Sequence, residues 1–172
     1  IPNSFESVTP ISCMTTTILV IEDDEFVAEF LQELLEDEAY EVLLTGNPIE
    51  ALRTFSTNKV DLVISDLALP VLSGFDFIER LRQTERGKTV PVIVISGRYP
   101  SASHRSLMMV KYAVTEYFDK PIEIERFLLT VQELSNQLRN VSSFEKGEPQ
   151  TSREPLRSKW LSNHPTRGNV EE

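Results

Sequence analysis

Short, almost wholly apolar runs alternate along this chain with longer stretches in which apolar and charged positions recur at helical spacing. The short runs are rich in Val and Ile, which is typical of parallel strands buried on both faces. Five strands are predicted, at residues 15–21, 41–45, 60–66, 90–96 and 115–118. Five helices are predicted at residues 25–36, 48–55, 75–86, 105–114 and 124–139. Strands alternating with helices in this way predict a doubly wound α/β domain.

Two of the predicted helices carry recognisable start signals. Asp24 can cap the first helix, and Asn47 followed by Pro48 can cap the second. The apolar face of the first helix is expected to contain Phe26, Val27, Phe30, Leu31, Leu34 and Leu35.

The two ends of the chain lack this periodicity. Residues 1–14 mix Pro, Asn, Ser and Thr with isolated apolar residues, so we expect a disordered leader that is not necessarily native. Residues 15–139 form the predicted domain. Residues 140–172 are polar and rich in Ser, Pro, Gly and charge, so we expect a flexible tail. A partner-docking helix that aligns Leu156, Trp160 and Leu161 is the alternative for that tail.

The composition excludes several classes of protein. A formal net charge of -10 argues against direct nucleic-acid binding and against binding to anionic membranes, because both need a basic surface. The single cysteine, Cys13, excludes a disulfide framework and a cysteine-based metal site. No apolar run is long enough for a membrane span, and no signal peptide is evident, so a cytoplasmic protein is expected.

Chemically useful side chains follow the predicted strands. Glu22 and Asp23 end the first, Asp66 ends the third, Ser96 ends the fourth and Lys120 follows the fifth. In a flavodoxin-like strand order, 2-1-3-4-5, the first and third strands are neighbours about 4.8 Å apart. Three carboxylates at that edge would repel one another unless a cation lay among them, and oxygen ligands favour Mg²⁺.

These residue types suit phosphoryl transfer to Asp66. A carboxylate is already ionised at neutral pH, so it can attack phosphorus without a general base. A metal ion and Lys120 would neutralise the phosphoryl oxygens, and the Ser96 hydroxyl could donate a hydrogen bond to the product.

The ordered motifs resemble the CheY-like receiver domain of bacterial two-component response regulators. The resemblance covers roughly residues 16–139: an acidic pair after the first strand, a phosphoacceptor segment at residues 61–70 followed by Gly74, a hydroxyl after the fourth strand and Lys120-Pro121 after the fifth. It implies that Asp66 takes a phosphoryl group from a phosphohistidine on a sensor histidine kinase or a phosphotransfer protein.

The resemblance also implies a metal site and a switch. Mg²⁺ would be held by Asp23, Asp66 and the backbone carbonyl of Ala68, with Glu22 acting through water. A cis peptide bond often precedes the proline that Pro121 matches. On phosphorylation Ser96 would turn toward the phosphoryl group and Tyr117 would swing inward. This would remodel the face made by the fourth helix, fifth strand and fifth helix, which would then bind a downstream protein or a second copy of the chain.

Some positions depart from the family pattern. Glu22 replaces the commoner Asp, Ser96 the commoner Thr, and Ala113 the usual Gly before the last strand. Ala68 and Arg98 occupy the two positions that tune dephosphorylation in this family. Because Ala68 cannot orient a water molecule, slow self-dephosphorylation is expected.

Two other functions compete with this one. The fold could serve as an interaction module that is never phosphorylated. A phosphatase of the haloacid dehalogenase kind also uses a strand-end Asp and Mg²⁺, but those enzymes carry a second Asp two residues later, where this chain has Ala68. The leading hypothesis is therefore a signalling receiver, not an enzyme that turns over a separate substrate.

Overall fold

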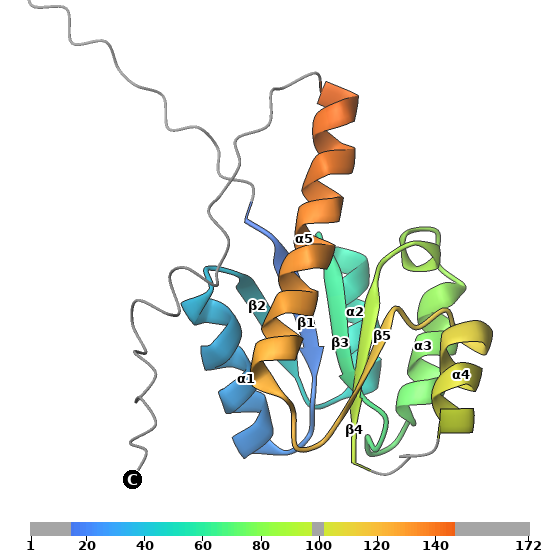
Figure 1. The fold of residues 1–172 in the computed structure, drawn as a ribbon. Helices are drawn as coiled ribbons and strands as arrows, with labels where there is room; N and C mark the ends of the chain where they lie inside the picture. Colours follow the sequence, from blue (N-terminus) through green and yellow to red (C-terminus); the bar gives the residue numbers. More distant parts are fainter. Residues whose placement is uncertain (1–14, 98–101, 147–172) are drawn as a thin grey trace, which may run out of the picture. The chain divides into compact units, whose positions relative to one another are not determined.

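A single parallel sheet forms the centre of the computed structural model, which describes residues 15–97 and 102–146. Its five strands lie in the order β2-β1-β3-β4-β5 (Figure 1), and all neighbouring pairs are parallel. The strands are β1 (Thr17–Ile21), β2 (Glu41–Thr45), β3 (Leu62–Asp66), β4 (Val92–Ser96) and β5 (Glu116–Asp119). The predicted flavodoxin-like fold and strand order are confirmed.

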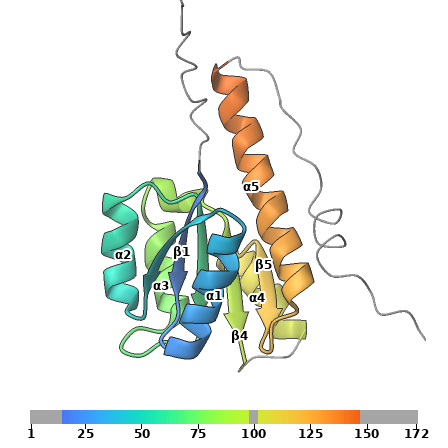
Figure 2. The same ribbon diagram turned by 90° about the vertical axis from the view of Figure 1, so that its left-hand side faces the viewer.

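Helices cover both faces of this sheet. The described residues contain α1 (Glu25–Asp37), α2 (Pro48–Thr57), α3 (Gly74–Arg82), α4 (Ala102–Lys111), α5 (Ile124–Lys146) and the short 3₁₀ helix η1 (Arg86–Lys88). Figures 1 and 2 show α1 and α5 on one face and α2 and α3 on the other. Right-handed crossovers between parallel strands place helices in this way.

Side-chain caps start three of these helices. The side chain of Asp24 accepts hydrogen bonds from the backbone N–H groups of Phe26 and Val27, and Asn47 caps α2 in the same manner. Ser73 caps α3 by accepting from the Asp76 N–H. Each cap satisfies backbone donors that have no partner within the helix.

The hydrophobic core lies in two layers, one on each side of the sheet. Every residue of β1, β3 and β4 is buried, as predicted for central parallel strands. One layer packs alternate strand residues against α2 and α3, including Phe55, Phe77 and Leu81. The other packs the remaining strand residues against α1 and α5, including Leu35 and Phe127.

Helix α1 buries a different set of side chains from the one that its sequence pattern suggests. Ala28, Leu31 and Leu35 are buried, whereas Phe26 is 85% exposed and Phe30 is 40% exposed. The prediction that Phe26 and Phe30 belong to the core face is wrong. At about 100° per residue, Phe26 points far away from the line through Ala28, Leu31 and Leu35.

Helix α4 lies three residues earlier than predicted. It spans Ala102–Lys111 instead of residues 105–114. Ala113 has a left-handed backbone, with φ 50°, and this conformation cannot continue a right-handed helix. The alanine that departs from the family pattern therefore adopts the backbone that a glycine would favour.

Helix α5 continues to Lys146, beyond the predicted end near residue 139. Leu134, Leu138 and Val141 continue the apolar repeat at helical spacing, which accounts for the extension. The chain divides into two compact units, residues 1–138 and 139–172. The expected leader at residues 1–14, Arg98, and the alternative tail helix around Trp160 lie outside the described residues.

The described part of the chain contains no helix with the length and apolar character needed to cross a membrane.

Candidate functional site

The carboxyl ends of β1, β3, β4 and β5 meet at one edge of the sheet. Parallel pairing aligns Ile21 with Ser65, Asp66 with Ile95, and Ser96 with Asp119. The residue that follows or ends each strand is therefore brought to the same edge. In an open α/β sheet, this is the edge at which ligands bind.

Asp66 is the last residue of β3 and is only 6% exposed. Its Oδ1 accepts a hydrogen bond of 2.9 Å from the backbone N–H of Ala68. The loop that follows is folded tightly back, because the Gly74 N–H donates to the carbonyl of Leu67 at 3.1 Å. These two hydrogen bonds fix the Asp66 carboxylate at the carboxyl end of β3.

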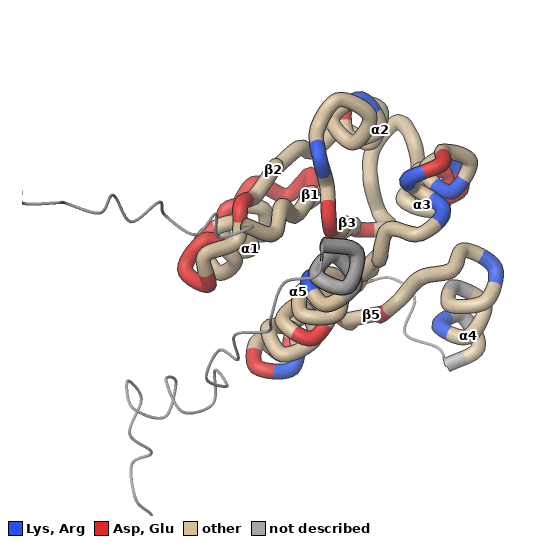
Figure 3. Tube along the Cα trace, turned by 90° about the horizontal axis from the view of Figure 1, so that it is seen from above, with Lys and Arg blue, Asp and Glu red and all other residues tan. Residues whose placement is uncertain are grey.

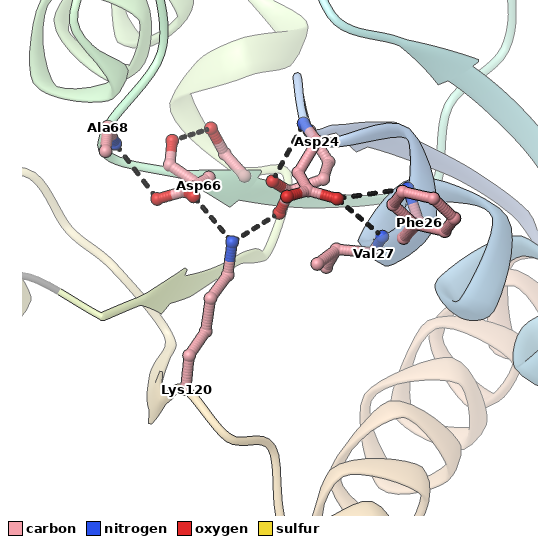
Figure 4. A network of polar contacts seen from close by, with 8 residues as sticks. Asp24, Phe26, Val27, Asp66, Ala68 and Lys120 are labelled. Atoms are coloured by element: carbon pink, nitrogen blue, oxygen red, sulfur yellow. Dashed lines mark hydrogen bonds and ion pairs between the residues drawn. The ribbon is translucent and has the colours of Figure 1, made fainter.

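Lys120 bridges two carboxylates that are far from it in sequence. Its Nζ lies 2.7 Å from Oδ2 of Asp66 and 2.7 Å from Oε2 of Glu22 (Figure 4). Burial would lower the pKa of the Lys120 ammonium, but its hydrogen bonds to Asp66 and Glu22 and their charges raise that pKa above the usual lysine value. Lys120 therefore remains a cation beside Asp66. The peptide bond between Lys120 and Pro121 is cis.

Glu22 is the most buried carboxylate of the site, at 3% exposure. Burial raises the pKa of the Glu22 carboxyl above its usual value, and the hydrogen bond and charge of Lys120 oppose that rise only in part. The Asp24 N–H also lies 3.4 Å from Oε1 of Glu22. Burial thus disfavours the charged form of Glu22, whereas Lys120 favours it.

Three carboxylates at this edge have a geometry that a cation could use. Glu22, Asp23 and Asp66 each offer one oxygen, and these oxygens all lie within 4.8 Å of one another. Asp23 is exposed, unlike the other two. One lysine faces three carboxylates, so the cluster keeps an excess of negative charge. Hard oxygen donors with a solvent-facing side fit Mg²⁺, which commonly retains several water ligands.

Ser96 and Tyr117 lie beside this cluster, on β4 and β5. Both are buried, Ser96 completely and Tyr117 to within 3% exposure. Burial raises the pKa of the Tyr117 hydroxyl, while its hydrogen bond with Ser96 acts in the opposite direction. The Tyr117 ring therefore lies inward, beside Ser96, in this structure.

The surface around the site is strongly asymmetric in charge. Residues 15–52 contain eleven acidic residues and no Lys, Arg or His. Figure 3 shows these acidic positions along α1 and near β1 and β2, whereas basic positions lie mainly over α2, α3 and α4. A partner that approaches over α1 therefore meets negative charge.

The structure brings together most of the side chains that the sequence singled out. Glu22, Asp23, Asp66 and Lys120 form one cluster, Ala68 contacts Asp66 through its backbone, and Ser96 contacts Tyr117. Sequence reasoning missed Arg105, whose guanidinium reaches β5 from α4. No spacing motif marks Arg105, because its two partners are set by how α4 lies against β5.

Comparisons with known proteins agree with this geometry. The family model of the response regulator receiver domain matches residues 18–132. The response regulator ArlR of Staphylococcus saprophyticus is 30% identical over 117 residues, which cover 68% of this chain and 51% of ArlR. The chain therefore spans about half the length of ArlR. The polar-differentiation response regulator DivK of Brucella ovis is 27% identical over 119 residues, covering 69% of this chain and 95% of DivK.

One solved structure illustrates the shared fold. The receiver domain of the sensor histidine kinase PA1611 of Pseudomonas aeruginosa was solved with a magnesium ion coordinated in its active site cleft. It is 23% identical to this chain, with a TM-score of 0.63 over 70% of this chain and 97% of that chain. The family match spans most of the sheet and every residue of the acidic cluster. This chain belongs to the response regulator receiver domain family of two-component signalling.

Proposed function

We propose that this protein is a phosphorylation-controlled signalling receiver in which Asp66 is the phosphoacceptor. The bridge from Lys120 to Asp66 and Glu22 is the observation that carries the proposal. It places a fixed positive charge within hydrogen-bond distance of a strand-end carboxylate that also lies beside Asp23. Positioning and charge neutralisation are the main requirements of phosphoryl transfer.

The reaction needs no side chain to remove a proton from the nucleophile. An Asp66 oxygen attacks the phosphorus of a phosphohistidine, a P–O bond forms, and the donor P–N bond breaks with its electron pair on the leaving imidazole. The acceptor becomes an acyl phosphate. Lys120 stabilises negative charge on the transferred group, and the Ala68 N–H holds Oδ1 of Asp66 in place.

Mg²⁺ is the cofactor that fits this site. Asp23, Asp66 and the backbone carbonyl of Ala68 would hold it, with Glu22 acting through water. When bound, the ion would neutralise phosphoryl oxygens and the excess charge of the carboxylates. The support is the set of three oxygens within 4.8 Å of one another.

The phosphoryl donor is a protein, either a sensor histidine kinase or a phosphotransfer protein. A phosphohistidine can reach the buried Asp66 only if its carrier covers the rim of the site. That rim presents Phe26, at 85% exposure, next to the capped start of α1 (Figure 4), and Val71, at 87% exposure, in the loop after β3. Exposed apolar side chains beside a polar site suit a docking partner.

The output surface is the face formed by α4, β5 and α5. On α4, Leu107 is 54% exposed and Val110 is 85% exposed. Phosphorylation would draw the Ser96 hydroxyl toward the new phosphoryl group and favour the inward position of Tyr117. A downstream protein, or a second copy of this chain, would read the change. The compartment proposed for this exchange is the cytoplasm.

Intact mass spectrometry tests the proposal directly. After incubation with acetyl phosphate and Mg²⁺, the protein should gain one phosphoryl group, and Asp66→Asn should gain none. Asp61→Asn is the matched control, because Asp61 directly precedes β3 and so lies at the opposite end of that strand from Asp66. It should be phosphorylated normally.

Three results would contradict the proposal or parts of it. Labelling of Asp66→Asn at the wild-type rate would show that another residue is the acceptor. Continuous release of phosphate from p-nitrophenyl phosphate would favour the phosphatase alternative. If neither acetyl phosphate nor a panel of phosphorylated histidine kinases labels the protein, the interaction-module alternative replaces the proposal.

A further inference from the structure

Arg105 joins α4 to two residues of β5. Its guanidinium forms an ion pair with Oδ2 of Asp119, and its Cζ lies 5.3 Å from the centre of the Tyr117 ring. Tyr117 and Asp119 are two residues apart on one strand, so their side chains lie on the same side of the sheet. Asp119 directly precedes Lys120 of the acidic site. One side chain of α4 therefore contacts both the switch tyrosine and the residue next to the site lysine.

Helix α4 has few other anchors among its described side chains. At positions 103, 105–107 and 109–111 no side chain is buried, and Arg105 is the least exposed of them. Val110 is 85% exposed, and Leu107 and Met109 are 54% and 46% exposed. Among these described positions, Arg105 contacts β5 through polar and ring contacts that do not depend on apolar burial.

The contacts of Arg105 are also imperfect. Its Nε is buried, and no described residue accepts a hydrogen bond from it. A buried donor without a partner opposes the closed arrangement, while the ion pair and the ring contact favour it. Opposing effects of this kind leave the arrangement easy to shift in either direction.

An equivalent arginine lies on the opposite face of β5. Arg126 of α5 has its Cζ 4.6 Å from the centre of the Phe118 ring and an ion pair of 3.3 Å with Glu116. Its contacts match those of Arg105 in kind, but Phe118 packs in the core layer of α1 and α5, away from Ser96. Arg126 thus provides an internal control for a purely structural arginine.

We propose that Arg105 is a positioning residue that holds the inward arrangement of Tyr117. By contacting Tyr117 and Asp119 together, it holds α4 against β5 and keeps Tyr117 inward beside Ser96. The inference rests on the proposed function in one respect, namely that Ser96 and Tyr117 connect Asp66 to the output face. Weakening the Arg105 contacts then frees α4 without removing the phosphoacceptor.

The test follows Tyr117 and α4 separately from the chemistry. The full chain is labelled with 3-fluorotyrosine, which gives four fluorine NMR signals because the protein has four tyrosines, and Tyr117→Phe identifies the relevant one. In Arg105→Ala, the Tyr117 signal should move toward the value of an exposed tyrosine. Amide hydrogen exchange of residues 102–111 should become about tenfold faster, reporting local opening of α4.

Matched variants distinguish a positioning role from general destabilisation. Arg126→Ala should leave the Tyr117 signal and α4 exchange unchanged. Arg105→Lys keeps the charge but lacks the planar guanidinium that contacts ring and carboxylate together, so it should behave like Arg105→Ala. If Arg105→Ala has the same Tyr117 signal and the same α4 exchange rates as the wild type, the proposal is overturned. If Arg105→Lys matches the wild type in these two measurements, the ring contact has no such role.

The same samples separate this proposal from the proposed function. Arg105→Ala should still gain one phosphoryl group from acetyl phosphate, by intact mass. If the wild-type protein gains none, the proposed function fails. The Tyr117 signal and α4 exchange would still decide whether Arg105 holds the inward arrangement of Tyr117.

Discussion

Gly74 packs against Asp66 so closely that a Cβ atom on Gly74 would lie 2.3 Å from the carbonyl oxygen of Asp66. The start of α3 is thereby pressed onto the end of β3, and any larger residue must push the two apart. The glycine of the phosphoacceptor segment has a steric function at this point, since its close neighbours are backbone atoms that cannot turn away.

Gly74→Ala should destabilise the protein by about 2 kcal/mol or more, because overpacking against backbone forces the loop to move. Urea unfolding measures this loss. Gly97→Ala is the control, since its Cβ would meet its nearest atom, the Cβ of Lys120, at an ordinary 3.7 Å. Equal stability losses in the two variants would contradict the steric explanation.

Val71 has a left-handed backbone, with φ 69°, although it is β-branched and 87% exposed. Val71→Gly should therefore stabilise the protein by about 0.5–1 kcal/mol, the relief of strain exceeding the added chain entropy of glycine. Val110→Gly makes the same change at similar exposure within α4 and should instead destabilise the protein by about 0.3–0.5 kcal/mol. A loss of stability in Val71→Gly, measured by urea unfolding, would refute this reading.

Arg82 of α3 donates hydrogen bonds to the carbonyls of Gly87, Val90, Tyr112 and Ala113. It thus links α3 to the turn between α4 and β5. Arg82→Ala should reduce the free energy of unfolding by about 2–3 kcal/mol, because hydrogen bonds from a charged group are lost and carbonyls lose partners. Arg80→Ala, on the exposed side of the same helix, should change it by less than about 0.5 kcal/mol. The prediction fails if the two variants unfold alike.

Mg²⁺ should raise the unfolding temperature in the absence of any phosphodonor. At one hundred times its dissociation constant, an ion that binds only the folded state adds about 2.7 kcal/mol. Asp23→Asn should abolish this shift. Asp24→Asn should retain it, because Asn also caps helices and Asp24 is engaged with the N–H groups of Phe26 and Val27. Loss of the shift in both variants would mean that general surface charge, not the predicted ligand set, attracts the ion.

Phosphorylated Asp66 should lose its phosphoryl group slowly. The only polar atoms of Ala68 belong to its backbone, and its methyl side chain cannot orient an attacking water molecule. Ala68→Asn should therefore shorten the half-life of the phosphorylated protein, followed by intact mass after removal of acetyl phosphate. A half-life of seconds that does not change in Ala68→Asn would count against this role.

Much of the fold follows from local pattern. The apolar runs that end at Ile21, Asp66 and Ser96 can be recognised as central strands because a parallel strand is buried on both faces and tolerates few polar residues. Asp24 and Asn47 are recognisable caps for a similar reason, since their bonds reach only two or three residues along the chain. Such short-range features are encoded almost entirely in neighbouring residues.

Helix faces were predicted less well. Phe26 and Phe30 are as apolar as Leu31, yet α1 buries Leu31 and leaves Phe26 almost fully exposed. Periodicity shows that a helix has an apolar side, but the rotation of that helix on the sheet decides which residues are covered. The end of α4 depended likewise on the left-handed Ala113, where the residue itself is an ordinary helix former and only the Gly usual in the family points to a turn.

The sequence by itself therefore determined the strands, their flavodoxin-like order through the family pattern, and the residue types at the strand ends. Only the tertiary structure decided that Lys120 bridges Glu22 and Asp66 at 2.7 Å each, that Tyr117 already lies inward, and that Arg105 contacts it from α4. The physical reason is the range of the interactions. Burial periodicity and capping act between near neighbours, whereas these contacts join residues up to 98 positions apart and depend on how whole helices lie on the sheet.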